Sequence, residues 1–147
     1  MAILFWLCAA AMAYVYVGYP LLLFLVSRVV RRRVAKAAIT PTVTMVIAAY
    51  NEEQAIAKKL ENSLALDYPA DKLDILVASD GSTDATNRIV SEFAGRQPGR
   101  VTLLDLPRGG KTVGQNRAAD VARGEILVFS DATTMYDPQA VRALVAN

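Results

Sequence analysis

The sequence predicts an α/β fold, with a parallel sheet and alternating helices, preceded by one transmembrane helix. The first observation behind this prediction is an uncharged apolar segment over residues 1–27, which a cluster of basic residues follows. The second is the regular alternation, from Val43 onward, of short β-branched runs with amphipathic helical segments. We therefore divide the chain into a transmembrane helix (1–27), a basic juxtamembrane linker (28–42) and a globular domain (43–147).

The apolar segment is long enough to span a bilayer, which takes about 20 apolar residues. Gly18-Tyr19-Pro20 is expected to kink this helix. Basic residues that follow a span stay on the cytoplasmic side, and here they are Arg28, Arg31, Arg32, Arg33 and Lys36. The prediction is a single-pass membrane protein with its N-terminus outside and its globular domain in the cytoplasm. A cleaved signal peptide is the disfavoured alternative, because such peptides carry their positive charge before the apolar run.

The charge distribution separates the membrane flank from the domain. Eleven of the sixteen basic residues lie beyond Lys36, together with all fourteen acidic residues, so the domain is mildly acidic. Nucleic acid is therefore not an expected partner, whereas the basic flank is suited to contact membrane lipid. The chain has no histidine and a single cysteine, so any metal would be held by oxygen, which favours Mg²⁺ or Mn²⁺.

The elements of the domain follow from the apolar pattern. Strands are expected at Val43–Ala48, Leu73–Ser79, Val101–Leu104 and Glu125–Phe129. Helices are expected at Glu52–Leu66, from Asp84 to about Ala94, at Thr112–Arg123 and from Asp137 onward. Asn51 is expected to cap the first of these helices, and Val113, Ala118 and Val121 to be the apolar contacts of the third. Such alternation implies a parallel sheet with helical crossovers.

Polar groups follow all four predicted strands. They are Asn51–Glu53, Asp80–Asp84, Arg108–Lys111 and Asp131–Thr134. The carboxyl ends of parallel strands share one edge of the sheet, and ligands bind at that edge. The chemistry indicated is the binding of a charged, sugar-bearing ligand. Carboxylates can accept hydrogen bonds from ribose hydroxyls or base N–H groups, and a cation held by Asp131 can bridge two phosphates, with Lys111 and Arg108 adding positive charge.

Some of these residues also have simpler interpretations. Glu53 and Asp84 are better explained as helix caps and dipole partners than as ligands. Arg108 is equally well explained as a solvated turn residue, and Asn116 as a buried residue bonded to the nearby loop.

Taken together, the motifs resemble the inverting family 2 glycosyltransferases of GT-A fold. The resemblance rests on Ala48–Glu53, Ser79–Asp84, Gly110-Lys111 with Asn116, and Phe129–Thr133, and it extends from Val43 to the C-terminus. It implies a Rossmann-like GT-A nucleotide-sugar-binding half-domain. It also implies sugar transfer, with inversion, from a nucleotide-sugar, usually a UDP-sugar. The arrangement of a membrane span before the domain is similar to that of the membrane-bound members of the family, which build polysaccharides or glycolipids. The implied acceptor is therefore a saccharide or a lipid-linked molecule.

The resemblance also implies roles for single residues. Tyr50 and Glu52 would lie at the nucleotide base and ribose, and Asp80 would hydrogen-bond the base. Lys111 would lie near the nucleotide, and Asp131 would be the first acid of the metal motif.

This chain departs from the family pattern in two ways. Thr133 stands where the motif usually has an acid, so the metal would be held through Asp131 and water. The general base is expected beyond Asn147, which makes the chain an expected N-terminal fragment that carries the donor-binding part. One alternative is a catalytically inactive, membrane-anchored nucleotide-binding fragment. Another is a P-loop NTPase, suggested by Gly109–Thr112 but opposed by Asp105, where that loop requires glycine.

Overall fold

A computed structural model of the chain describes residues 1–30 and 39–146. It divides into two compact units, Met1–Ala35 and Lys36–Asn147, each of which is treated by itself. The boundary falls within the predicted linker 28–42. Most of that linker, including Arg31–Arg33 and Lys36, lies outside the described residues.

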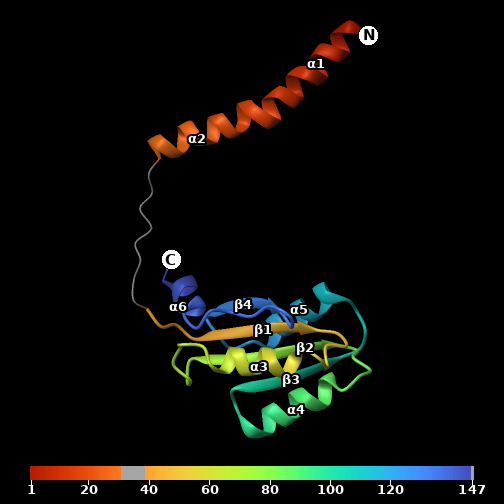
Figure 1. The fold of residues 1–147 in the computed structure, drawn as a ribbon, viewed down its shortest axis with the longest axis vertical. Helices are drawn as coiled ribbons and strands as arrows, with labels where there is room; N and C mark the ends of the chain where they lie inside the picture. Colours follow the sequence, from red (N-terminus) through yellow and green to blue (C-terminus); the bar gives the residue numbers. More distant parts are fainter. Residues whose placement is uncertain (31–38, 147) are drawn as a thin grey trace. The chain divides into compact units, whose positions relative to one another are not determined.

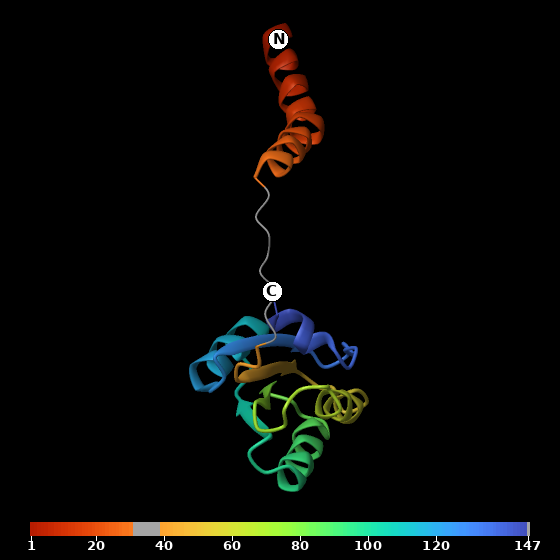
Figure 2. The ribbon, with the colours of Figure 1, turned by 90° about the vertical axis from the view of Figure 1, so that its left-hand side faces the viewer.

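The described part of the N-terminal unit contains one continuous apolar helix over Ala2–Val29, whose most apolar 18-residue window has a mean hydropathy of 1.9. By length and composition it is able to cross a membrane. It comprises α1 (Ala2–Ala13), a π-helical turn η1 (Tyr14–Gly18) and α2 (Tyr19–Val29). The backbone N–H of Tyr19 bonds to the carbonyl of Tyr14, and Pro20 follows without an N–H of its own. The helix axis bends at this turn, as the sequence predicts (Figures 1 and 2).

The second unit is built on a parallel four-stranded sheet. Its strands are β1 (Val43–Ala49), β2 (Leu73–Asp80), β3 (Val101–Leu106) and β4 (Ile126–Asp131), in the order β3-β2-β1-β4. The register pairs Ala49 with Ser79, Ala48 with Asp131, and Asp80 with Leu106. The four strands therefore end close to one another along one edge. The central strands β1 and β2 are buried on both faces, as expected for β-branched runs in a parallel sheet.

Helices cover both faces of this sheet (Figure 2). One face packs against α3 (Ile56–Leu64), α4 (Thr86–Arg96) and the short α6 (Ala140–Val145), and it holds the larger core cluster. The other face packs against α5 (Lys111–Val121), whose Ala118 meets Val46 and Leu76 in a smaller cluster. The α/β fold class predicted from the sequence is confirmed.

The connections place a topological switch point between β1 and β4. From β1 the chain moves outward through α3 and α4 to β2 and β3, and then returns through α5 to β4 on the far side of β1. The crossovers on either side of β1 therefore run over opposite faces of the sheet. A crevice opens outside the strand ends where this happens, and such crevices are the usual ligand sites of open α/β sheets.

Several details of the sequence prediction are wrong. The last helix begins at Ala140 rather than Asp137, and α5 ends at Val121 rather than Arg123. The first domain helix begins at Ile56 rather than Glu52, because residues 51–55 form a turn in which Asn51 adopts a φ of 53°. Asn51 does not cap this helix but accepts a hydrogen bond from the N–H of Thr83. The apolar contacts of α5 also differ. Val113 and Val121 are about half exposed, and the buried residues are the small Gly114 and Ala118, which let the helix approach the sheet closely.

Candidate functional site

A pocket of about 390 Å³ lies at the carboxyl ends of β1, β2 and β4. All five residues that the sequence assigns to the donor site line it. The lining residues are Ala48, Ala49, Tyr50, Glu52, Ala78, Asp80, Arg108, Lys111, Gly114, Asp131, Ala132 and Thr133. Because β1 and β4 flank the switch point, the fold itself brings together residues as far apart in the sequence as Ala48 and Thr133.

Asp80 is the most strongly bonded of these side chains. Its carboxylate accepts hydrogen bonds from the backbone N–H of Gly109 at 2.6 Å and of Gly110 at 2.9 Å, and from Nη1 of Arg108 at 2.6 Å. The N–H of Gly109, followed by that of Gly110 and the Arg108 guanidinium, lowers the pKa of Asp80 below its ordinary value, although burial of the side chain opposes this. Asp80 is therefore a carboxylate that organises the loop after β3.

Gly81 makes this arrangement possible. Its φ is +68°, and a Cβ at this position would lie 2.9 Å from the backbone nitrogen of Arg108. Only glycine allows both the backbone conformation and the close approach of the two loops. The strand-end glycine thus determines how near Asp80 and Arg108 can come.

For Arg108 the sequence left two interpretations open, a positive charge beside the ligand and a solvated turn residue. Its guanidinium carbon lies 3.4 Å from the centre of the Tyr50 ring, which is stacking distance, while the same group pairs with Asp80. The interpretation as a solvated turn residue is therefore wrong, even though the side chain is 56% exposed. The β2–β3 register could have indicated this contact, because it pairs Asp80 with Leu106, only two positions before Arg108.

Asp131 and Lys111 form a second charged pair across the pocket. Nζ of Lys111 lies 2.6 Å from Oδ1 of Asp131, and both side chains are more than half exposed. Thr133 lies exposed two positions after Asp131, and the buried Ala132 separates the two. Among the described residues there is no group of three or more His, Cys, Asp or Glu side chains that could hold a metal. At this end of the pocket, the oxygen ligands available to a cation are the Asp131 carboxylate and neighbouring hydroxyl groups.

The loops after β1 and β2 are joined by reciprocal hydrogen bonds. Asn51 donates its N–H to Oγ of Ser82, and its side-chain oxygen accepts from the N–H of Thr83. Glu53 and Asp84 exchange similar bonds: the Glu53 N–H donates to Asp84, and the Glu53 carboxylate accepts from Ala85. Neither Glu53 nor Asp84 lines the pocket. Their interpretation as helix caps and dipole partners is wrong, because α3 and α4 have no side-chain cap at their N-cap residues and no acidic residue in their first turns. The backbone of Glu52 is held in the same way, because its N–H donates to Oγ1 of Thr86.

Asn116 has a different environment from the one expected. It lies on the exposed side of α5 rather than in the interior, so the prediction of a buried residue is wrong. It is also absent from the pocket lining.

The loop at Gly109–Thr112 does not fit the P-loop alternative. In that motif the backbone N–H groups cradle a phosphate. Here the N–H groups of Gly109 and Gly110 are directed at the Asp80 carboxylate. A carboxylate at this position repels a phosphate, so we discard the P-loop interpretation.

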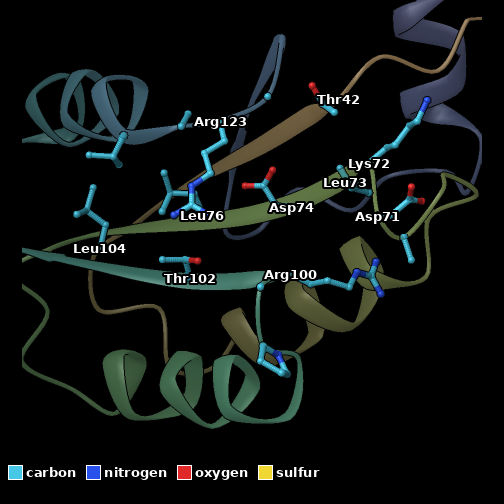
Figure 3. Close-up of a pocket in the computed structure, with 16 residues that line it drawn as sticks. Thr42, Asp71, Lys72, Leu73, Asp74, Leu76, Arg100, Thr102, Leu104 and Arg123 are labelled. Carbon is cyan, nitrogen blue, oxygen red and sulfur yellow. The ribbon is translucent and has the colours of Figure 1, made fainter.

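A larger pocket, of about 640 Å³, lies at the amino-terminal ends of the strands, opposite the ends that form the smaller pocket (Figure 3). Its charged lining includes Lys72, which bonds to Thr40, and Asp74, which bonds to Thr44. None of the polar groups that follow the strands lines this pocket. The smaller pocket is the stronger candidate, because it lies at the carboxyl edge and the switch point.

Comparison with known proteins adds independent information. The family model described as "Glycosyl transferase family 2" matches residues 44–147. A probable glycosyltransferase of Bacillus subtilis, YdaM, is 32% identical over 108 residues, which make up 71% of this chain and 26% of YdaM. A dodecaprenyl-phosphate galacturonate synthase of Rhizobium johnstonii is 28% identical over 107 residues, which make up 71% of this chain and 31% of that enzyme.

A solved structure extends the likeness to three dimensions. The mannosyltransferase PcManGT of Pyrobaculum calidifontis, in complex with GDP-mannose and Mn²⁺, superimposes with a TM-score of 0.76 at 32% identity. The match covers 94% of this chain and 42% of that one. The chain spans less than a third of the length of the two curated relatives and under half of the solved one.

Proposed function

Because the chain belongs to glycosyl transferase family 2, we propose that its strand-end pocket binds a nucleoside-diphosphate sugar. We infer that this sugar is transferred, with inversion, to a saccharide or lipid-linked acceptor. The observation that supports this most directly is the convergence of Tyr50, Asp80, Lys111 and Asp131 at the switch point. The dodecaprenyl-phosphate galacturonate synthase among its relatives supports a lipid-linked acceptor.

The nucleoside end of the pocket consists of Tyr50, Glu52 and Asp80. The Tyr50 ring offers a face on which a base can stack, and a guanidinium already stacks there. The Asp80 carboxylate accepts N–H donors, which suits uracil and guanine, since each carries a ring N–H beside a carbonyl group. Glu52 has an acceptor carboxylate for ribose hydroxyls. A UDP-sugar is our preferred donor, and the GDP-mannose bound by the solved relative makes GDP the natural competitor in any test.

The diphosphate end of the pocket consists of Lys111 and Asp131. A divalent cation, when bound, neutralises the charge of the diphosphate leaving group. The oxygen atoms present fit Mg²⁺ or Mn²⁺ as ligands. These ions prefer oxygen and keep several waters and phosphate oxygens in their coordination shell. Asp131 would hold the cation, and Thr133 would contribute at most a hydroxyl group. The Lys111 ammonium, 2.6 Å from Asp131, is near enough to contact the same phosphates.

The apolar helix Ala2–Val29 is proposed to anchor the chain in a membrane. Its length of 28 residues corresponds to about 42 Å at ~1.5 Å per residue, which exceeds the ~30 Å hydrocarbon core. Arg28 follows its apolar part, and the further basic residues at 31–36 favour a cytoplasmic location for the globular unit.

Nucleotide titration of the detergent-solubilised chain tests this function. UDP and GDP are titrated calorimetrically with and without Mn²⁺ into the wild type, Asp80→Ala and the control Asp120→Ala, which changes an exposed residue of α5. We expect binding of one nucleotide, with an affinity that Mn²⁺ increases. Asp80→Ala should weaken it at least about tenfold, because it removes a charged hydrogen-bond acceptor, whereas Asp120→Ala should leave it unchanged. A wild-type chain that is folded by circular dichroism but binds neither nucleotide would contradict the proposal.

A further inference from the structure

Lys59 is a buried lysine below the proposed diphosphate end of the pocket. It lies on α3 and has no exposed surface. Its Nζ donates a hydrogen bond of 2.6 Å to the carbonyl oxygen of Thr134 and lies 4.2 Å from the centre of the Tyr136 ring. Both partners belong to the segment that follows Asp131.

The next polar residue on the same face of α3 binds the same segment. Asn62 donates from Nδ2 to the carbonyl oxygen of Tyr136 at 2.9 Å, and its Oδ1 accepts from the Tyr136 N–H at 2.8 Å. Residues three apart on a helix lie on one face, so Lys59 and Asn62 act together. They hold three backbone groups within residues 134–136.

A charge at position 59 is costly to the fold. Burial lowers the pKa of Lys59 to about 8, although the negative charge of Asp131 opposes this. The neighbours of Lys59 on α3 that enter the core, Ile56 and Leu60, are fully buried and apolar. An apolar residue at position 59 would avoid the cost of desolvating an ammonium group, so the lysine at this position indicates a role other than core packing.

We propose that Lys59, with Asn62, is a positioning residue for Asp131 and Thr133. Lys59 fixes the backbone at 134–136 and thereby holds Asp131 and Thr133 in the positions from which they would contact the cation and the diphosphate. The role of the pocket in this inference rests on the proposed function. Neither Lys59 nor Asn62 lines the pocket, so each acts through the loop and not on the ligand.

Hydrogen exchange tests the positioning directly, without any ligand. The full chain in detergent is compared with Lys59→Met, which keeps an unbranched apolar stem but removes the ammonium group. The control is Lys58→Met, at the exposed neighbouring position on α3. We expect the amides of residues 132–137 to exchange about tenfold faster in Lys59→Met, the factor that corresponds to losing one charge-assisted hydrogen bond. The amides of β1 and β2 should keep their wild-type rates in both variants.

Nucleotide titration with and without Mn²⁺ provides the second readout. In Lys59→Met we expect the gain in affinity that Mn²⁺ confers to fall by about tenfold. Metal-free binding, which depends on Tyr50 and Asp80 at the other end of the pocket, should be unchanged. Asn62→Leu removes the two hydrogen bonds to the Tyr136 backbone, at a half-buried position, and should produce the same pattern. This variant replaces Lys59→Met if Lys59→Met does not fold.

The outcomes separate this inference from the proposed function. Wild-type exchange rates at 132–137 in Lys59→Met would overturn the inference. So would faster exchange throughout the sheet, because Lys59 would then serve stability alone. If the wild-type chain binds no nucleotide, the proposed function fails, while the exchange experiment still decides whether Lys59 positions the loop.

Discussion

Asp80 shows how one side chain can serve both architecture and chemistry. Its carboxylate fixes the loop after β3 through the N–H groups of Gly109 and Gly110, and it pairs with Arg108. The sequence predicted Asp80 as a ligand for a base, and the structure places it in the pocket with its oxygens already bonded to the protein. A nucleotide must therefore share or replace these contacts. The guanidinium stacked on Tyr50 is the group best placed to move.

The lowered pKa of Asp80 leads to a prediction about pH. Because the native pKa lies below the unfolded value of about 3.9, the ionised carboxylate stabilises the fold, fully so above that value. The contribution disappears as the pH falls below about 4 and through the native pKa. Asp80→Asn should therefore lose less stability than the wild type on acidification. Urea unfolding from pH 6 to pH 3, followed by circular dichroism, measures the difference, and parallel curves for the two proteins would contradict the prediction.

At the scale of elements, the strands were predictable and the helix ends were not. Val43–Ala49 and Leu73–Asp80 are buried on both faces, and a continuous β-branched run indicates such burial directly. The start of α3 was missed because Asn51–Glu53 bond to another loop more than 30 positions away, which no local pattern reveals. The role of Arg108 was left open for a similar reason, since its partners come from β2 and from the loop after β1.

Helix α5 illustrates a further limit of sequence patterns. It packs through Gly114 and Ala118, so its buried side carries almost no apolar side-chain surface, and the larger Val113 and Val121 are exposed. A search for large apolar residues at helical spacing selects the wrong face in such a helix.

This close packing predicts the effect of a larger side chain. Ala118→Leu should destabilise the fold by about 1–3 kcal/mol, because overpacking would push α5 away from Val46 and Leu76. Ala119→Leu, at the exposed neighbouring position, should change stability by no more than about 0.5 kcal/mol. Urea midpoints of the two variants test this prediction. Equal midpoints would show that α5 tolerates a larger separation from the sheet.

At the scale of the whole molecule, the chain combines an apolar helix with a sheet that has two uncovered edges. Within the described residues β3 pairs only with β2, and β4 only with β1. Phe129 on β4 and Leu144 on α6 are about half exposed. Exposed edges and apolar side chains promote association between molecules.

We therefore expect residues 39–147, expressed without the helix and most of the linker, to be poorly soluble. Size-exclusion chromatography with light scattering measures this, with the full chain in detergent as the reference. The expected result is aggregate or higher oligomer for residues 39–147 beside a uniform detergent complex for the full chain. A monodisperse domain that melts cooperatively would show that its edges are tolerated in water.

The reciprocal bonds between the loops after β1 and β2 have a consequence for engineering. Each loop satisfies main-chain N–H groups of the other. Asn51 and Glu53 accept from the N–H groups of Thr83 and Ala85. In the other direction, the N–H groups of Asn51 and Glu53 donate to Ser82 and Asp84. Neither loop can therefore be exchanged alone for that of a relative without leaving donors in the other unpaired. The two segments form a single transplantable module, and a chimaera designed to alter donor choice should carry both loops together.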